Sequence, residues 1–205
     1  MEDSYIHLRE DGRAGAHLVL TYHGTGGDEH QFAGFARQIY PDAHIVSPRG
    51  DVSEHGAARF FRRTGEGVYD MDDLAARVTK MAGFVAAHIA RTKARRVVAL
   101  GYSNGANIAA AVSFRNPEVF TDLIVMHPLI PFNPAPQPGL SGTRVLVTAG
   151  RRDPICPVPL TERLIGYFQA QAAETEAFWH AGGHEITREE MAAIAAFATR
   201  HGDAA

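Results

Sequence analysis

The residue with the clearest chemical potential is Ser103, which lies in the segment Gly101-Tyr102-Ser103-Asn104-Gly105. This segment fits the pattern G-x-S-x-G, in which a serine occupies a sharp turn between a strand and a helix. The context agrees, because the apolar segment 97–100 precedes the turn and a helix of small residues is predicted over 104–112. The pattern alone also fits a turn with an idle serine. In its context it predicts that Ser103 is a nucleophile.

A serine hydroxyl is a weak nucleophile at neutral pH, so it needs a histidine base and an acid that orients the base. Asp153 follows the apolar segment 144–149, and His184 follows the apolar segment 175–180 and precedes a predicted helix. The chain order serine, acid, histidine is that of hydrolases with this serine turn. The sequence therefore predicts a triad of Ser103, Asp153 and His184, although Asp153 also fits a simple Asp-Pro turn. The histidines set aside by their place in the chain are His23, His127 and His180.

A glycine-rich segment at 24–27 follows a predicted strand. In hydrolases with a serine turn, one oxyanion-binding amide belongs to the residue after the nucleophile and the other to such an early loop. We therefore expect the backbone amides of Asn104 and Thr25 to form the oxyanion hole, with His23 anchoring the loop. A phosphate-binding loop is the alternative, but the segment lacks both G-x-G-x-x-G and a lysine after the glycines.

Two irregular segments, 49–69 and 128–142, follow predicted strands and are candidates for the walls of a pocket, because loops at the carboxyl ends of strands build such sites. The residues expected to line an apolar, substrate-binding acyl pocket are Phe60, Phe61, Tyr69, Leu129, Ile130 and Ile155. Packing of Phe60 and Phe61 against neighbouring helices is the alternative. Arg59, Arg62 and Arg63 are interpreted as a solvated surface cluster rather than a site for acidic substrates.

The elements that must position these residues alternate along the chain. Apolar segments without polar alternation indicate strands buried on both faces, as in a parallel sheet; they lie at 17–23, 43–47, 96–102, 122–126, 144–149 and 175–180. Helices are predicted to begin near Asp28, Asp70 and Thr187, with capping boxes at Asp28/Gln31 and Thr187/Glu190. The alternation predicts one α/β domain over 1–205, with helices on both faces of a mostly parallel sheet. The segment 128–142 is too short for an independent lid domain.

Composition narrows the expected function classes. Of 205 residues, 45% are apolar and 21% are charged, and the net charge is −3 without a basic stripe, so nucleic acid is not an expected partner. No run approaches the ~20 apolar residues of a membrane span, and residues 1–5 lack the apolar run of a secretory signal. The single cysteine, Cys156, cannot form an internal disulfide and is interpreted as a small buried apolar residue. We expect a cytoplasmic protein without stable membrane insertion.

Several of these segments together resemble the bacterial phospholipase/carboxylesterase family of α/β-hydrolases, to which acyl-protein thioesterases are similar; they are 23–29, 59–63, 65–70, 101–105, 153–157 and 183–185. The resemblance extends over 5–197. It implies an α/β-hydrolase fold and a serine carboxylesterase that uses no cofactor or metal and cleaves esters of short to medium acyl chains. Asn104 and Thr25 depart from the thioesterase branch, which has Gln and Leu there, so depalmitoylation of proteins is not expected. Dienelactone hydrolases resemble the chain loosely, but they use a cysteine nucleophile.

Other functions would use the same residues. An acyl thioesterase or a lysophospholipase-type hydrolase needs the same triad and is the alternative among enzymes. A non-catalytic binding protein of hydrolase fold is the alternative of another class, but such proteins commonly lose a triad member and this chain has all three. The expected partner is a small-molecule acyl ester, and a homodimer is left open.

Overall fold

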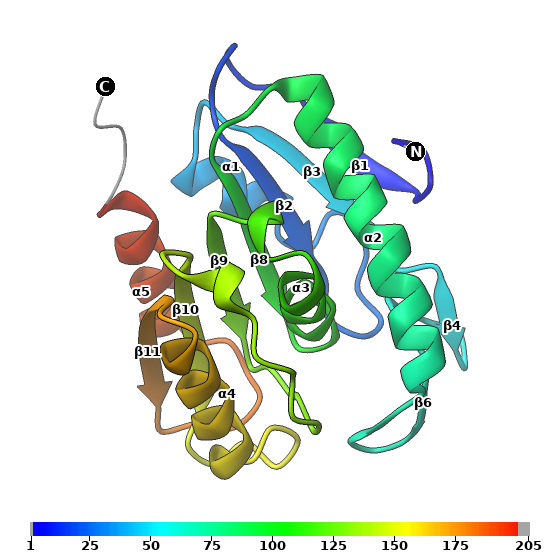
Figure 1. Cartoon of the computed structure of the whole chain (residues 1–205), viewed down its shortest axis with the longest axis vertical. Helices are drawn as coiled ribbons and strands as arrows, with labels where there is room; N and C mark the ends of the chain where they lie inside the picture. The colour runs from blue at the N-terminus through cyan, green and yellow to red at the C-terminus, as the bar shows by residue number, and fades with distance from the viewer. Residues whose placement is uncertain (1, 201–205) are drawn as a thin grey trace.

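The computed structural model describes residues 2–200, and within them a seven-stranded sheet runs in the order β1-β3-β2-β8-β9-β10-β11 (Figure 1). The edge strand β1 (His7–Glu10) pairs antiparallel with β3 (His44–Pro48), and every other neighbouring pair in this sheet is parallel. The remaining strands of the sheet are β2 (Leu18–Tyr22), β8 (Val97–Tyr102), β9 (Asp122–Met126), β10 (Arg144–Gly150) and β11 (Glu174–His180).

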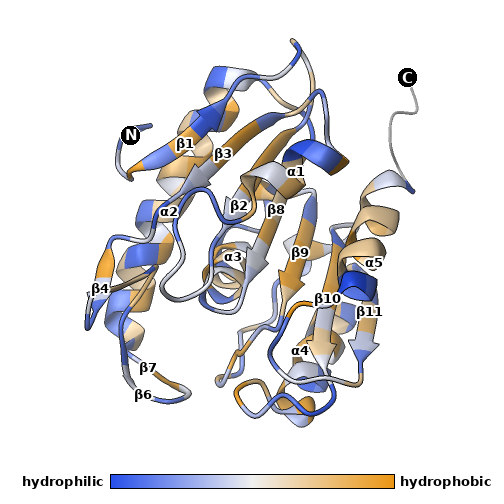
Figure 2. Ribbon diagram, turned by 180° about the vertical axis from the view of Figure 1, so that it is seen from behind, coloured by the Kyte–Doolittle hydropathy of each residue, from blue (hydrophilic) through white to orange (hydrophobic). Residues whose placement is uncertain are grey.

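Helices cover both faces of this sheet (Figures 1 and 2). They are α1 (Ala33–Ile39), α2 (Met71–Thr92), α3 (Asn104–Arg115), α4 (Val158–Ala170) and α5 (Arg188–Thr199). In β8, Val97 and Ala99 belong to the apolar cluster that includes α2, α3 and α4, whereas Val98 and Leu100 belong to the cluster that includes α1 and α5. Burying one such side chain contributes about 1.5–3 kcal/mol, and two covered faces explain why the strands lack polar alternation.

The six predicted strands are all present, and the expected α/β-hydrolase architecture of a mostly parallel sheet between helices is confirmed. Strand β1 was not predicted, because its sequence HLRE is polar and only partly buried, as suits an edge strand. Between β9 and β10 the described chain forms only the 3₁₀ turn Pro138–Leu140, so no lid domain is inserted there. Among the described helices, none is both long and apolar enough to cross a bilayer.

The predicted helix starts at Asp70 and Thr187 are confirmed, and the one at Asp28 is not. The Asp70 side chain caps α2 by accepting from the Asp73 amide, and Thr187 with Glu190 forms the predicted capping box of α5. The predicted box at Asp28 is wrong: α1 begins only at Ala33, and Phe32 at its N-cap makes no side-chain hydrogen bond. Gln31 Oε1 instead accepts from the Gly24 amide at 2.9 Å, and Asp28 Oδ1 accepts from the His30 amide at 2.9 Å. The polar residues before α1 therefore hold the glycine-rich loop rather than the helix.

The irregular segment 49–69 consists of two short hairpins. β4 (Val52–Glu54) pairs with β5 (Ala57–Arg59), and β6 (Arg63–Gly65) pairs with β7 (Val68–Tyr69), both antiparallel. The tight turns use residues with positive φ, among them His55, Gly56 and Gly67. These hairpins lie beside the carboxyl edge of the sheet and supply one wall of the cavity described below.

Candidate active site

Ser103 lies on the sharp turn between β8 and α3, as its sequence context predicts. Its backbone has φ 52° and ψ −114°, which residues with a side chain rarely adopt, and its N–H donates to the Met126 carbonyl at 2.9 Å. Glycine is required on both sides of the turn. A Cβ on Gly101 would lie 2.6 Å from the Gly105 carbonyl oxygen, and a Cβ on Gly105 would lie 2.3 Å from the Tyr22 carbonyl oxygen. The turn is therefore strained and closely packed.

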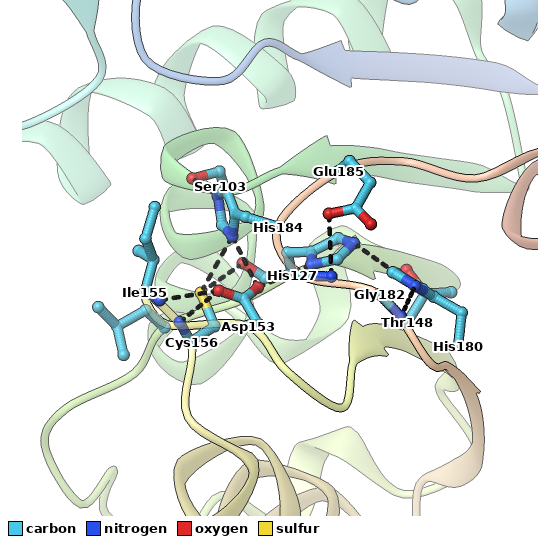
Figure 3. Close-up of polar contacts among 12 residues, drawn as sticks. Ser103, His127, Thr148, Asp153, Ile155, Cys156, His180, Gly182, His184 and Glu185 are labelled. Carbon is cyan, nitrogen blue, oxygen red and sulfur yellow. Dashed lines mark hydrogen bonds and ion pairs between the residues drawn. The ribbon is translucent and has the colours of Figure 1, made fainter.

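The structure brings together the three residues that the sequence selected, at the carboxyl edge of the sheet (Figure 3). His184 Nε2 lies 2.9 Å from Ser103 Oγ, and His184 Nδ1 lies 2.7 Å from Asp153 Oδ2. Because an ionised carboxylate can only accept, His184 Nδ1 carries a hydrogen and Nε2 is left to accept the hydroxyl hydrogen of Ser103. This is the arrangement in which a histidine acts as a general base toward a serine.

Asp153 is buried and has hydrogen-bond donors on both carboxylate oxygens. Oδ1 accepts from the amides of Ile155 at 2.8 Å and Cys156 at 2.9 Å, and Oδ2 accepts from two imidazoles, those of His184 and His127. Burial alone would raise the pKa of the Asp153 carboxyl, but the hydrogen bonds from backbone amides and imidazoles outweigh burial and hold that pKa below its usual value. Asp153 is therefore an ionised acceptor.

His127 is the site residue that sequence reasoning missed, because it precedes the acid in the chain and was set aside for that reason. Its Nδ1 lies 2.9 Å from Asp153 Oδ2, and its Nε2 faces Glu190 of α5. The side chain is fully buried. One signal could have identified it: His127 directly follows the predicted strand 122–126, just as Asp153 and His184 lie beyond the ends of theirs. Neighbouring parallel strands end at the same edge, so their following residues meet.

Among residues 2–200, two groups of side chains bring atoms that can bind a metal within 4.8 Å of one another: His127 with His180 and Glu190, and His127 with Asp153 and His184. In both groups the facing atoms are hydrogen-bond or ion-pair partners of one another. Hydrogen bonding therefore accounts for the placement of these side chains, and we assign no metal to them.

The glycine-rich loop is held in place next to Ser103. His23 Nε2 accepts from the Gly50 amide at 2.9 Å and its Nδ1 donates to the Gly24 carbonyl at 2.6 Å, so His23 anchors the loop as expected. Burial, the largest influence, lowers the pKa of His23 and favours this neutral form. Thr25 and Asn104, the two expected oxyanion residues, both border the cavity that contains Ser103.

A cavity of about 250 Å³ opens beside Ser103 and His184. Three of the predicted wall residues, Tyr69, Leu129 and Ile155, line it. The Tyr69 hydroxyl donates to the Leu129 carbonyl and accepts from Asn107 Nδ2 at 2.8 Å, which fixes this part of the wall. The other residues that line the cavity are Thr25, Arg59, Arg63, Glu66, Gly67, Tyr102, Asn104, Asn107 and Cys156.

The other three predicted wall residues, Phe60, Phe61 and Ile130, do not line this cavity. Phe60 and Phe61 are fully buried; the ring of Phe60 packs on Tyr22 and the ring of Phe61 packs on Tyr69. Ile130 borders a separate cavity with Phe132, Leu164 and Tyr167. The core, rather than an acyl pocket, takes these apolar side chains because burial there removes more of their surface from water.

Arginines occupy the place expected for phenylalanines. Arg59, which is only 4% exposed, and Arg63 line the cavity, so their interpretation as a solvated cluster was wrong, whereas Arg62 is exposed as expected. Arg59 donates to Thr25 Oγ1 at 2.7 Å and lies 3.3 Å from Glu54. Arg63 pairs with Glu54 at 2.9 Å and with Glu66 at 2.8 Å. We call this set, Glu54, Arg59, Arg63 and Glu66, the charged wall.

Cys156 borders the cavity, yet its surroundings oppose a nucleophilic role. Its Sγ donates to the His127 carbonyl at 3.1 Å and lies 3.8 Å from His184 Nδ1, the nitrogen that Asp153 already occupies. Burial raises the pKa of the Cys156 thiol well above its usual value. The thiol is therefore protonated at neutral pH, in line with its interpretation as a small buried residue.

Comparison with known proteins agrees with this architecture. The model of the dienelactone hydrolase family matches residues 50–202. The chain is 39% identical over 186 residues to the putative hydrolase MhqD of Bacillus subtilis (strain 168), an alignment that covers 90% of this chain and 92% of that protein.

Solved structures also resemble the chain over nearly its whole length. The chain is similar to the protein Atu2452 of unknown function from Agrobacterium tumefaciens str. C58, with 53% identity, a TM-score of 0.91 and 96% coverage of both chains. It is also similar to a carboxylesterase of Bacillus cereus, with 32% identity, a TM-score of 0.88, and coverage of 95% of this chain and 93% of that chain.

The expected resemblance to carboxylesterases is thus confirmed by a solved structure, while the matching family is the one that the sequence analysis treated as only loosely similar. Dienelactone hydrolases were expected to differ because they use a cysteine nucleophile. The corresponding turn here carries Ser103, which lies beside His184 and Asp153. On its fold and on both sequence matches, the chain is a hydrolase that belongs to the dienelactone hydrolase family.

Proposed function

We propose that the protein is a serine carboxylesterase that hydrolyses small acyl esters through Ser103, His184 and Asp153. The observation that carries this proposal is the position of His184, which lies 2.9 Å from the Ser103 hydroxyl and 2.7 Å from the Asp153 carboxylate. A base placed in this way activates a serine that would otherwise be a poor nucleophile.

The geometry supports a two-step reaction. His184 Nε2 takes the hydroxyl proton as Ser103 Oγ bonds to the ester carbonyl carbon, and the carbonyl oxygen becomes an oxyanion that the amides of Asn104 and Thr25 stabilise. The bond to the alcohol then breaks as His184 gives the proton to the leaving oxygen. Water attacks the acyl-enzyme with the same assistance and releases the acid and Ser103. Removing one oxyanion donor typically costs on the order of 100-fold in turnover.

The cavity supports short acyl groups more than medium ones. Its volume is about 250 Å³, and the charged wall occupies the side where Phe60 and Phe61 were expected. A long alkyl chain would have to displace water from arginine and glutamate without replacing their hydrogen bonds, which is unfavourable. An acyl thioesterase would use the same residues, and matched oxygen and thio esters of one short acyl group distinguish the two reactions.

A second candidate substrate class, esters that carry a carboxylate, is favoured by Arg59 and Arg63 in the wall of the cavity. Guanidinium groups bind carboxylates through paired, charge-assisted hydrogen bonds. The glutamates of the charged wall oppose this by pairing with the same arginines. Comparing p-nitrophenyl butyrate with the mono-p-nitrophenyl ester of succinic acid, which has the same acyl length, separates the two substrate classes.

Labelling by a fluorophosphonate probe tests the central proposal. We expect the wild-type protein to be labelled and to hydrolyse p-nitrophenyl acetate, and Ser103→Ala to lose both properties. Ser113→Ala is the matched control, because Ser113 is a buried serine of α3 that does not border the cavity. Activity should decrease steadily from p-nitrophenyl acetate to p-nitrophenyl decanoate. Equal labelling of wild type and Ser103→Ala would refute the assignment of the nucleophile.

A further inference from the structure

A buried histidine and a buried glutamate lie behind the triad, and the mechanism above does not use them. His127 follows β9 and is fully buried, with Asp153 on one side and Glu190 on the other. Figure 3 shows its ring beside Asp153 and His184. We propose that His127 is a positioning residue, held as an imidazolium between Asp153 and Glu190, that keeps the Asp153 carboxylate ionised and fixed behind His184. This inference rests on the proposed role of the triad.

The hydrogen-bond donors around Asp153 determine one proton of His127. Asp153 accepts from two backbone amides on Oδ1 and from His184 Nδ1 on Oδ2. His127 Nδ1 lies 2.9 Å from the same Oδ2. Because the carboxylate has only lone pairs to offer, His127 Nδ1 must carry a hydrogen.

The second proton of His127 is determined by Glu190. His127 Nε2 lies 3.4 Å from Glu190 Oε1 and Oε2. These two oxygens also accept from the Thr148 hydroxyl and from the Thr187 amide, so the glutamate too is an ionised acceptor. Both oxygens that face His127 Nε2 are thus acceptors, and a hydrogen on Nε2 would give them a donor.

His180 also faces His127 Nε2 and Glu190. Its Nδ1 accepts from the Gly182 amide at 3.0 Å, so a neutral His180 carries its hydrogen on Nε2. That nitrogen lies 3.4 Å from His127 Nε2 and 3.8 Å from Glu190 Oε2. The alternative to an imidazolium is therefore a neutral His127 whose Nε2 accepts from His180.

Charge decides between these two forms. Among the described residues, the ion pairs of Asp153 and Glu190 are all with histidines, and both carboxylates are completely buried. Two buried negative charges with neutral imidazoles between them would be strongly unfavourable. One proton on His127 pairs with both charges at once.

The titratable groups that face His127 come from every element packed around it: Tyr102 of β8, Asp153 and Cys156 of the loop after β10, His180 of β11, His184 and Glu185 of the following loop and Glu190 of α5. Burial alone lowers the pKa of His127, but the hydrogen bonds to Glu190 and Asp153 outweigh burial and leave that pKa above its usual value. The net charge around His127 therefore favours its protonation.

The protonated ring has a direct consequence for catalysis. The ring centroids of His127 and His184 lie 5.1 Å apart, and both rings donate to the same Asp153 oxygen. A positive charge there reduces the pull of Asp153 on the proton that His184 must give up before it can act as a base. Loss of that charge should therefore move the acidic limb of the kcat/KM profile to higher pH.

The test uses the intact protein and two readouts. In nuclear magnetic resonance spectra of protein with ¹⁵N-labelled histidine, the signals missing from His127→Asn identify His127. We expect both of its ring nitrogens to carry hydrogen at pH 8, and we expect Glu190→Gln to make the ring titrate at lower pH. A ring with a single hydrogen at pH 8 in the wild-type protein would overturn the inference, whatever its activity.

The kinetic readout uses p-nitrophenyl acetate between pH 5 and 9. Asparagine at 127 can still donate to Asp153 but has no charge, so the acidic limb should move to higher pH. His88→Asn is the control, because His88 is a buried histidine of α2 that packs on Phe84 rather than on Asp153. An unchanged limb in His127→Asn would contradict the inference, whereas labelling of Ser103→Ala would contradict the proposed function.

Discussion

The two sides of the site differ in their exposure to solvent. The acid side, which comprises Asp153, His127 and Glu190, is sealed, and the side chain of each is completely buried. The charged wall on the other side of the cavity buries Arg59 but reaches solvent through Arg63 and Glu66, whose side chains are 27% and 63% exposed. Electrostatic interactions are strong in the dry region and weak in the wet one. On the proposed function, we expect the acid side to determine the chemistry and the charged wall to influence which substrate binds.

The largest expected effect comes from the acid side. Asp153→Asn places an amide where both imidazoles donate, so His184 loses its orienting acceptor, and kcat should decrease by about four orders of magnitude. Steady-state kinetics with p-nitrophenyl acetate measure this effect. Asp51→Asn is the matched control on the surface, where Asp51 pairs with Lys80, and it should behave like wild type. A loss below tenfold in Asp153→Asn would remove the distinction between the two sides.

A core residue next to the charged wall should affect stability without affecting specificity. Phe60→Ala deletes a fully buried ring that packs on Tyr22 and His23, and it should reduce the free energy of unfolding by about 3–5 kcal/mol. Urea denaturation measures the loss. The dependence of activity on acyl chain length should stay unchanged, whereas Ile155→Ala should alter that dependence with little loss of stability, because Ile155 lines the cavity and is 39% exposed. If Phe60→Ala instead altered the dependence on acyl chain length with little loss of stability, Phe60 would have to line the cavity.

A smaller effect is expected in the charged wall itself. If carboxylate-bearing esters are substrates, Arg63→Met should lower kcat/KM for the succinate ester about tenfold, or about 1.4 kcal/mol, and leave the butyrate ester unaffected. Arg62→Met is the matched control, because Arg62 is the next residue in the chain but pairs with Asp70 away from the cavity. An equal ratio of the two esters in both variants would exclude this substrate class.

The smallest effect on activity concerns Cys156, which borders the cavity from the acid side. Because burial raises the pKa of its thiol, the thiolate needed for alkylation is scarce at pH 8, and iodoacetamide should react slowly with the folded protein and rapidly after unfolding in urea. Cys156→Ser keeps a donor for the His127 carbonyl and should retain activity near the wild-type level. Fast alkylation of the folded protein with loss of activity would indicate a reactive thiol instead.

Sequence reasoning succeeded where a local pattern determines the structure. The strands could be recognised from unbroken apolar runs, and the starts of α2 and α5 from the capping residues Asp70 and Thr187. The triad followed from two rules, chain order and position after a strand, and the structure places its members within hydrogen-bond distance. The strand and capping signals need only residues that are close together in the chain, and the triad adds to such local signals only the order in which they occur.

It failed where the direction of a side chain depends on tertiary contacts. In the segment 59–63, aromatic and charged residues are adjacent, and only the register of the short hairpins determines that Phe60 enters the core while Arg59 and Arg63 face the cavity. His127 was set aside because it precedes the acid in the chain. Its contacts with Asp153 and Glu190, which come from two other elements, could not be read from that order. The capping pattern at Asp28 was overridden because Gln31 hydrogen-bonds to the glycine-rich loop.

The close approach of Gly105 to β2 has a consequence for how this site can change. Its Cα lies against the carbonyl groups of Tyr22 and His23, the residues from which the loop carrying Thr25 departs. The spacing between Ser103 and the loop that carries Thr25 is therefore determined by contact of main chain with main chain. On the proposed function, substitutions in the cavity wall can therefore alter what is bound without disturbing that spacing.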